Sequence, residues 1–326
     1  MIMKYLKGLG VDNYMLLLIA TVAVAFLLPV HGIGTVVVNY ITYWAVALLF
    51  FLYGAKLDSA SVRKGLMNWR VQGWTFCATY VFLPALGVGL AFVVSPFLGT
   101  VAALGFVYLA VLPSTVQSSI AFTSIAGGNV PAAICAASLS NLTGVFLTPA
   151  LVAILLSQSG QGVSPDAIIK IATQILLPFI VGQFLRPWIG ATVRHYRALT
   201  LGVDRGAILL IVYSAFSAGT MAGLWSKVPP TSLLLIVLFV MIFLAIAIVI
   251  MVLVGKFTGM PPEDRLVLLF CGSTKSLATG LPMATALFSE ELVGAIVLPL
   301  MIYHMSQLLV CAFISQRRSK KIVLTA

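Results

Sequence analysis

The chain has 326 residues, of which 61% are hydrophobic and only 8% are Asp, Glu, Lys or Arg, and its formal net charge is +11. Soluble domains carry about 25% charged residues, and disordered chains combine low hydrophobicity with high charge, so the composition excludes both classes. In a membrane protein a basic excess is typical of cytoplasmic loops and does not indicate a nucleic-acid partner. We therefore predict an all-α polytopic protein that is embedded in the lipid bilayer.

Ten apolar stretches follow one another along the chain with short connections, each near the ~20 residues that a helix needs to cross a bilayer. They are apolar on all sides, as helices surrounded by lipid are. The first stretch follows Lys4 and Lys7 as in a signal peptide, but no small-residue cleavage site comes after it, so we predict that it is retained. The predicted transmembrane spans are residues 13–30, 37–57, 71–94, 101–125, 130–157, 167–188, 206–225, 231–255, 265–288 and 292–316.

Basic residues predict the orientation of these spans. Ten spans place both termini on one side of the membrane, and 16 of the 19 Lys and Arg residues lie on that side. Lys170 and Lys227 lie on the other side, and Lys275 lies within a span. Because cytoplasmic loops carry the excess of Lys and Arg, we predict a multi-pass protein of the cell (inner) membrane with both termini in the cytoplasm.

Two connections that are five spans apart, residues 126–129 and 289–291, are similarly short. Five spans reverse the direction of the chain across the membrane, so a five-plus-five arrangement gives an inverted repeat, which is the architecture of many secondary transporters. We predict a first five-helix repeat over residues 1–158 and a second, inverted five-helix repeat over residues 159–326.

Matching polar runs interrupt the fourth and ninth predicted spans. They read Leu112-Pro-Ser-Thr-Val-Gln-Ser-Ser119 and Cys271-Gly-Ser-Thr-Lys-Ser276. Pro removes a backbone donor, and unpaired backbone groups at this depth are tolerated only where they line a cavity or are buried in protein. Pro and Ser can also simply kink and pack helices, but the match between the two spans favours one shared binding site. Its candidate residues are Ser114, Thr115, Ser118, Ser119, Asn141, Ser273, Thr274, Lys275 and Ser276.

Lys275 is the most informative of these residues. A charge at the bilayer centre costs ~3 kcal/mol on insertion scales, and all eight acidic residues lie near span ends, so the sequence offers no carboxylate partner. Either hydroxyls, amides and carbonyls hold the ammonium, or the amine is neutral because burial disfavours its charged form. We do not expect the ammonium of Lys275 to extend to the membrane–water interface, because Lys275 lies ten positions from the start of its predicted span. Other polar residues of spans five and ten, including Ser140 and Gln307, are assigned to hydrogen bonding between helices.

At these two runs, and at Gly127-Gly-Asn-Val-Pro-Ala-Ala133 and Leu147-Thr-Pro149, the sequence resembles the bile acid:sodium symporter superfamily, solute carrier family 10. It is most similar to the SBF-like branch, which includes bacterial proteins and the seventh human member, and the resemblance covers essentially the whole chain. The resemblance implies ten helices in two inverted five-helix repeats. It also implies a core domain with broken, crossing helices 4 and 9, a panel domain made of helices 1, 2, 6 and 7, substrate between the domains, and sodium behind the crossing.

The chain departs from this pattern at the residues that bind sodium. Sodium-coupled members carry an acid in the ninth helix where Phe270 stands, usually an amide in the third helix where Thr79 stands, and hydroxyls in the fifth helix near Ala133 and Ala137. The polar pair of the fourth helix is kept. Sodium prefers several hard oxygen ligands, so sodium coupling is in doubt, and the ammonium of Lys275 could stand in for a bound cation.

The leading hypothesis is a secondary active transporter that moves a small organic anion by alternating access. It is not an enzyme, needs no cofactor, and has a sodium ion or a proton as its candidate coupling ion. The ammonium of Lys275 would offset the substrate's charge and organise the hydroxyls of Ser114, Ser118 and Ser276. One alternative is an intramembrane hydrolase with a Ser–Lys dyad, since a buried lysine can act as a base, although no orienting partner or oxyanion motif is evident. Another is a regulatory membrane protein without transport.

Overall fold

The computed structural model describes residues 13–56, 68–157, 169–223 and 229–325, and all regular structure in these ranges is helical. Two short segments, η1 and η2, are π-helical, which means that their hydrogen bonds span five residues instead of four. The elements are α2 (Asn13–Leu27), α3 (Ile33–Lys56), α5 (Trp69–Cys77), η1 (Ala78–Phe82), α6 (Leu83–Val111), α7 (Gln117–Ile125), α8 (Val130–Ser157), η2 (Ile171–Leu176), α10 (Leu177–His195), α11 (Arg197–Met221), α12 (Pro230–Phe257), α13 (Pro262–Ser273), α14 (Leu277–Leu287) and α15 (Glu290–Thr325).

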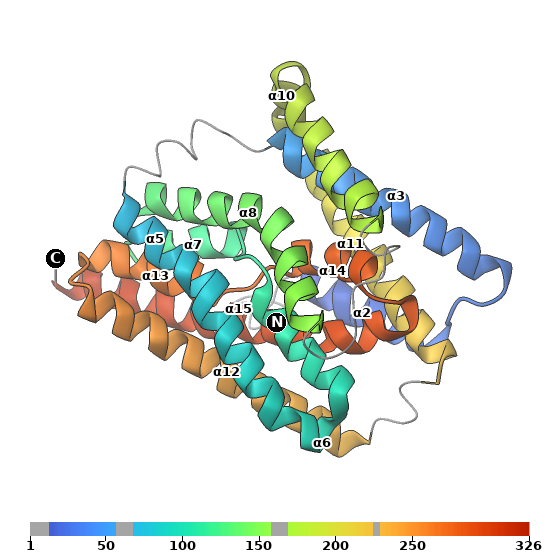
Figure 1. Ribbon diagram of the computed structural model, residues 1–326. Helices are drawn as coiled ribbons and strands as arrows, with labels where there is room; N and C mark the ends of the chain where they lie inside the picture. Colours follow the sequence, from blue (N-terminus) through green and yellow to red (C-terminus); the bar gives the residue numbers. More distant parts are fainter. Residues whose placement is uncertain (1–12, 57–67, 158–168, 224–228, 326) are drawn as a thin grey trace, which may run out of the picture.

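Eight helical segments within these described ranges are long and apolar enough to cross a membrane. One of them, Trp69–Val111, holds two helices, because Gly99 inside α6 has φ +77° and ψ 173°. Residues with a side chain avoid this conformation, and Figure 1 shows the ribbon folding back at the lower end of α6. The helix α2 is apolar but has only 15 residues. An all-helical, multi-pass membrane protein is therefore confirmed, and the number of ten spans stays a prediction.

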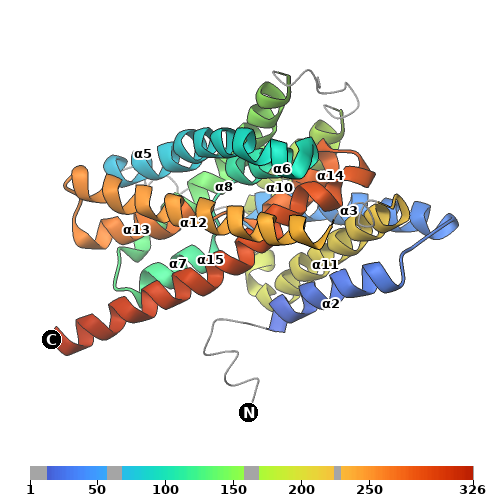
Figure 2. The same ribbon diagram turned by 90° about the horizontal axis from the view of Figure 1, so that it is seen from below.

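The helices form two groups that lie side by side in both views of the ribbon (Figures 1 and 2). In the α3 group, which comprises α2, α3, η2, α10 and α11, α3 packs along α10. A Cβ atom on Gly54 would lie 2.2 Å from the carbonyl oxygen of Phe179, and one on Gly182 would lie 2.1 Å from that of Phe51. Glycines at both positions therefore let the two backbones approach closely, as small residues do between membrane helices. The α13 group comprises α5, η1, α6, α7, α8, α12, α13 and α15, and α14 contacts both groups.

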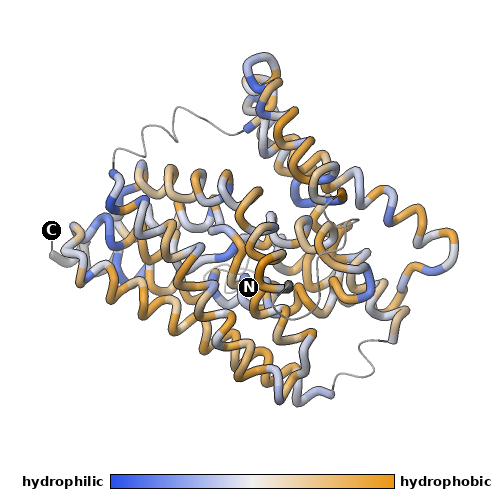
Figure 3. Tube along the Cα trace, viewed as in Figure 1, coloured by the Kyte–Doolittle hydropathy of each residue, from blue (hydrophilic) through white to orange (hydrophobic). Residues whose placement is uncertain are grey.

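Burial differs strongly between the helices. In the segment Pro262–Leu287, which contains α13 and α14, 94% of the most apolar stretch is buried, against 22–50% in the other seven candidate spans. Large apolar side chains of the outer helices, such as Leu27, Phe92 and Phe257, are exposed. Figure 3 shows apolar residues along most of the length of α12. Since a bilayer is itself apolar, α12 is a lipid-facing wall and α13–α14 is the centre of the molecule.

Candidate functional site

Two non-helical stretches meet in this centre. The first interruption, residues 112–116, separates α6 from α7, and the second, residues 274–276, separates α13 from α14. Pro113 disfavours a helical conformation at the residue before it, and Leu112 is extended with φ −73° and ψ 152°. The backbone N–H of Ser276 donates to the carbonyl oxygen of Pro113 at 2.8 Å. The two interruptions are therefore in direct backbone contact.

Side chains of α8 satisfy the backbone groups that the first interruption leaves without helical partners. The hydroxyl of Thr148 donates to the carbonyl oxygen of Val111 at 2.8 Å. The N–H of Ser114 donates to the hydroxyl of Ser140 at 3.0 Å, and the amide of Asn141 donates to the carbonyl oxygen of Ser114 at 2.7 Å. Buried backbone groups need such partners, so α8 holds the first interruption in its shape.

Side chains of α15 do the same for the second interruption. The amide of Gln307 accepts from the backbone N–H of Lys275 and donates to its carbonyl oxygen, both at 2.8 Å. The hydroxyl of Tyr303 donates to the carbonyl oxygen of Ser273 at 2.5 Å. The ring of His304 lies 2.9 Å from the amide nitrogen of Gln307. Polar side chains of one neighbouring helix thus satisfy several backbone groups at each interruption.

The side chain of Lys275 is fully buried and ends among three backbone carbonyls. Its Nζ donates to the carbonyl oxygens of Ala110 at 2.6 Å, Leu112 at 2.7 Å and Thr79 at 3.2 Å. An ammonium has three N–H donors, so these oxygens match its full hydrogen-bonding capacity. Within the described residues Lys275 forms no ion pair, so no carboxylate there would balance a charge on its amine.

The sequence explains why these carbonyls are available. Two of them lie at the end of α6, where the last carbonyls of a helix have no N–H four residues further on. The third belongs to η1, where the N–H of Leu83 bonds the carbonyl oxygen of Ala78 in a π-helical step. The same step would pair Thr79 with Pro84, which has no N–H. The end of α6 and the π-helical segment η1, where carbonyl oxygens lack helical partners, therefore supply the acceptors of Lys275.

These bonds correct one expectation from the sequence. We expected the ammonium to organise the hydroxyls of Ser114, Ser118 and Ser276, but the hydrogen bonds of Nζ go to carbonyl oxygens. The physical reason is that a freed carbonyl in an apolar interior is costly unless it finds a donor. The serine hydroxyls have other partners.

A compact cluster of hydroxyls lies where the two interruptions meet. Thr274 is at its centre: its Oγ1 is 3.0 Å from the hydroxyl of Ser114, 3.1 Å from that of Thr115 and 2.8 Å from that of Ser119. These four side chains are at most 6% exposed, and Ser118 joins at the edge through a 2.7 Å bond to Thr115. This hydroxyl cluster brings together five of the nine predicted site residues.

The other predicted residues serve the backbone. Asn141 bonds the first interruption, as described above. The hydroxyl of Ser276 accepts from the N–H of Thr279 at 3.2 Å and so caps α14. Ser273 turns back to its own helix, where its hydroxyl donates to the carbonyl oxygen of Leu269 at 2.5 Å, so the structure does not bring it into the hydroxyl cluster.

Sequence reasoning missed the roles of several residues around the interruptions. The sequence assigns Ser140 and Gln307 to general hydrogen bonding between helices, but each bonds the backbone of one interruption directly. A usable signal was present for the α15 pair, because Tyr303 and Gln307 are four residues apart and therefore share a helix face. A second signal was Pro84, five residues after Thr79.

The position of the acid expected in sodium-coupled relatives is occupied by apolar packing. Phe270 is fully buried, and its ring centroid is 5.9 Å from that of Phe122. Ala133 and Ala137 are also fully buried. The backbone of Phe270 still offers a hydrogen-bond acceptor in this region, because the hydroxyl of Thr274 donates to the carbonyl oxygen of Phe270 at 2.8 Å. In the part of the chain that the structure describes, no three His, Cys, Asp or Glu side chains gather as metal ligands.

Comparison with known proteins places the chain in a family of transporters. The SBF-like CPA transporter family matches residues 12–320. An uncharacterised protein of Pseudomonas aeruginosa is 48% identical over 311 residues, and the Escherichia coli protein named "Putative symporter YfeH" is 44% identical over 314; each alignment covers 95% of this chain and 93% of the relative. Sodium/bile acid cotransporter 7 of Xenopus tropicalis is 28% identical over 274 residues, 82% of this chain and 79% of its own. The resemblance seen in the sequence is confirmed, and the chain belongs to the SBF-like CPA transporter family of the bile acid:sodium symporter superfamily.

Proposed function

We propose that the protein is a secondary active transporter of a small organic anion, and that the anion binds where the two interruptions meet. The observation that carries this proposal is the fully buried amine of Lys275, which is bonded to uncharged carbonyls and has no carboxylate partner among the described residues. A positive charge at this depth is costly when it is alone. An anionic substrate lowers that cost, and the hydroxyl cluster next to it offers hydrogen bonds that orient a carboxylate or sulfonate.

The proposed topology assigns the two groups of helices to two moving parts. The α3 group would be the panel domain, and the α13 group with α14 would be the core domain. The half of α6 after Gly99 with α7 would be the broken fourth helix, and α13 with α14 the broken ninth, in inverted repeats 1–158 and 159–326. Both termini would lie in the cytoplasm. The support is that α14 contacts both groups, so the proposed site adjoins the surface between them.

The same geometry supports transport that does not depend on sodium. Rings of backbone carbonyls coordinate alkali ions in other proteins, and here three carbonyls surround an ammonium instead. We propose that Lys275 takes the place of the coupling cation. If the amine loses its proton during the cycle, transport is coupled to protons.

The hydrolase alternative has less support. A Ser–Lys dyad needs the lysine within hydrogen-bonding reach of a serine hydroxyl. The hydrogen bonds described for Nζ of Lys275 go to backbone carbonyls.

The test begins with a thermal-shift screen of purified protein against organic anions, with and without sodium. Hits are then measured as uptake into proteoliposomes, first in sodium buffer and then with choline in its place. We expect saturable uptake of at least one anion at similar rates in both buffers. Strict sodium dependence would contradict the proposal that Lys275 takes the place of the coupling cation. Labelling of Ser114 by a covalent serine probe would contradict the proposal that the protein only transports.

A further inference from the structure

Exposed basic residues gather at one end of the α13 group, where α5 and α13 begin and α12 and α15 end. Figures 1 and 2 show these four helix ends on the side of the molecule that carries the C-terminus, and Figure 3 shows hydrophilic residues there. We call this surface the basic end. Its exposed cations are Arg70, Lys256, Arg265, Arg317 and Arg318.

The positive charge of the basic end is not balanced locally. None of its five cations forms an ion pair with a described residue. Of the two acids at this end, Glu263 is exposed, whereas Asp264 is 9% exposed and accepts hydrogen bonds from two asparagine amides. In the α3 group, by contrast, Lys56 is paired with Asp204 at 2.8 Å. The basic end therefore attracts anions.

The lengths of α12 and α15 place this end at the level of lipid headgroups. Helix α15 has 36 residues and is about 54 Å long at 1.5 Å per residue, against ~30 Å for the hydrocarbon core of a bilayer. Arg317 lies about 40 Å along α15 from Glu290, and Lys256 lies about 40 Å along α12 from Pro230. A bilayer with its headgroups is ~40–45 Å thick, so both cations reach the opposite headgroup layer.

Exposed aromatic side chains accompany the cations on three helices. Trp69, Phe257 and Phe313 are 73%, 82% and 56% exposed. The first two are chain neighbours of basic residues, and the guanidinium carbon of Arg317 lies 4.4 Å from the ring centroid of Phe313. Aromatic rings are enriched where lipid headgroups meet acyl chains. A soluble anion has nothing apolar for these rings to contact, so the pattern favours a lipid.

The turn between α12 and α13 fixes one cation in position. The Nε–H of Arg265 donates to the carbonyl oxygen of Met260 at 2.6 Å. A Cβ atom on Gly255 would lie 3.2 Å from Cγ of Arg265, so the glycine leaves room for the arginine stem to pack on α12. The terminal nitrogens of the guanidinium carry four further N–H donors, and arginine binds phosphate oxygens with two such bonds in parallel.

We propose that the basic end binds the headgroups of anionic phospholipids. The lipid phosphate accepts hydrogen bonds from Arg265, the other cations attract the headgroup charge, and the exposed rings contact the acyl chains. Clusters of four to eight basic residues next to a membrane helix are typical of anionic-lipid recognition. The surface lies at the end of the α13 group and not between the two groups of helices, and the proposal does not depend on transport.

The test uses the full-length protein in neutral detergent micelles and native mass spectrometry, which counts bound lipids. The probes are phosphatidylglycerol and phosphatidylcholine with the same two oleoyl chains. We expect phosphatidylglycerol to bind about tenfold or more tightly than phosphatidylcholine, and this preference to fall as salt screens the exposed charges. Arg70→Gln and Arg317→Gln should each weaken binding of phosphatidylglycerol by about fivefold and leave that of phosphatidylcholine unchanged.

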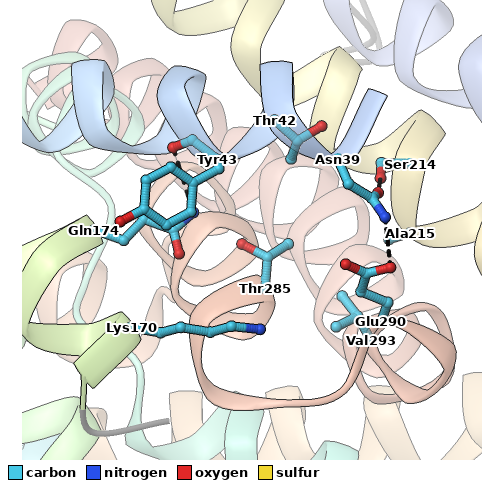
Figure 4. A pocket seen from close by; sticks show the side chains of 10 residues that line it. All are labelled: Asn39, Thr42, Tyr43, Lys170, Gln174, Ser214, Ala215, Thr285, Glu290 and Val293. Carbon is cyan, nitrogen blue, oxygen red and sulfur yellow. Dashed lines mark hydrogen bonds between the residues drawn. The ribbon is translucent and has the colours of Figure 1, made fainter. Parts of the chain in front are cut away.

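Lys170→Gln is the matched control for general surface charge. Lys170 is exposed, and Figure 4 shows it in a pocket with Glu290, at the opposite end of α15 from Arg317. This variant should bind phosphatidylglycerol like the wild type. Elution volume on gel filtration checks that all variants fold.

A second control separates a lipid from a soluble phosphate. Glycerol 3-phosphate carries the charge without acyl chains and should not displace phosphatidylglycerol at equal concentration. Displacement would overturn the proposal in favour of a site for soluble phosphates. Equal affinity for the two lipids would also overturn it, as would wild-type binding in Arg70→Gln and Arg317→Gln, or an equal loss in Lys170→Gln.

Discussion

Helix α12 and the segment formed by α13 and α14 follow each other in the chain but occupy opposite environments. Between its ends α12 is almost entirely apolar, and only 28% of its most apolar stretch is buried; α13–α14 carries Ser273, Thr274, Lys275 and Ser276, and 94% is buried. In a soluble protein the apolar helix would be the one inside. Here the polar segment is inside.

The reason for this reversal is the solvent. Lipid tails are as apolar as a leucine side chain, so apolar helices gain little by leaving them. Unpaired backbone and side-chain polar groups, in contrast, are costly in lipid and must find partners inside the protein. The comparison therefore predicts that stability depends most on the residues that satisfy the interruptions.

The largest effect is expected for Lys275→Ala. It removes the donor of three buried carbonyls, each worth roughly 1–3 kcal/mol when left unpaired, so the variant should lose transport and also unfold at a clearly lower temperature. An uncharged side chain at this position would avoid the cost of a buried charge, but it would leave the three carbonyl oxygens without a donor. Thermal unfolding in detergent and uptake into proteoliposomes measure both effects.

Two controls sharpen the result for Lys275. Lys256→Ala removes an exposed lysine at the end of α12 and should behave like the wild type. Lys275→Arg should also fail to transport, because a planar guanidinium does not fit a compact ammonium position. Full activity in Lys275→Ala would remove Lys275 from the proposed site.

A smaller effect is expected for Gln307→Leu, which leaves the backbone N–H of Lys275 without a partner and leaves its carbonyl oxygen with only the ring of His304, at 3.4 Å. The expected loss in the free energy of unfolding is roughly 1–3 kcal/mol. Gln316→Leu is the matched control, because Gln316 lies on the same helix and is exposed. Equal unfolding temperatures for the two variants would show that α15 does not hold the second interruption.

Packing alone should also distinguish the two regions. Leu268→Ala on α13 removes a fully buried side chain, whereas Leu238→Ala on α12 removes one that is 52% exposed. We expect a loss of roughly 2–4 kcal/mol for the first, and almost none for the second, since lipid replaces the lost contacts. Chemical unfolding in mixed micelles measures the difference, and equal losses would contradict the assignment of α12 as a lipid-facing wall.

The smallest effect is expected for Thr148→Val, which removes one hydrogen bond to Val111. Single hydrogen bonds between membrane helices contribute about 1 kcal/mol. Thr143→Val on the same helix, where the hydroxyl bonds carbonyls of its own helix, should cost less. The ranking of their unfolding temperatures tests whether α8 stabilises the first interruption.

The sequence predicted which segments meet, because matching polar runs are rare in apolar spans. It could not predict the partners of Lys275, because they are main-chain oxygens whose availability depends on a π-helical step near Thr79 and on the end of α6. Nor could it separate Ser273 from Thr274. These hydroxyls are adjacent in the chain, but one bonds its own helix and the other lies at the centre of the hydroxyl cluster.

Because the acceptors of Lys275 are backbone oxygens, they affect how this site can change during evolution. Substitutions of the side chains at Thr79, Ala110 and Leu112 leave their carbonyl oxygens in place, so the lysine's ligands are not encoded by the residues that carry them. They are encoded instead by Pro84 and Pro113, which disrupt the helices. A comparison of relatives that looks for ligand residues would therefore find none, whereas one that asks whether the lysine and these two prolines are gained and lost together would detect the site.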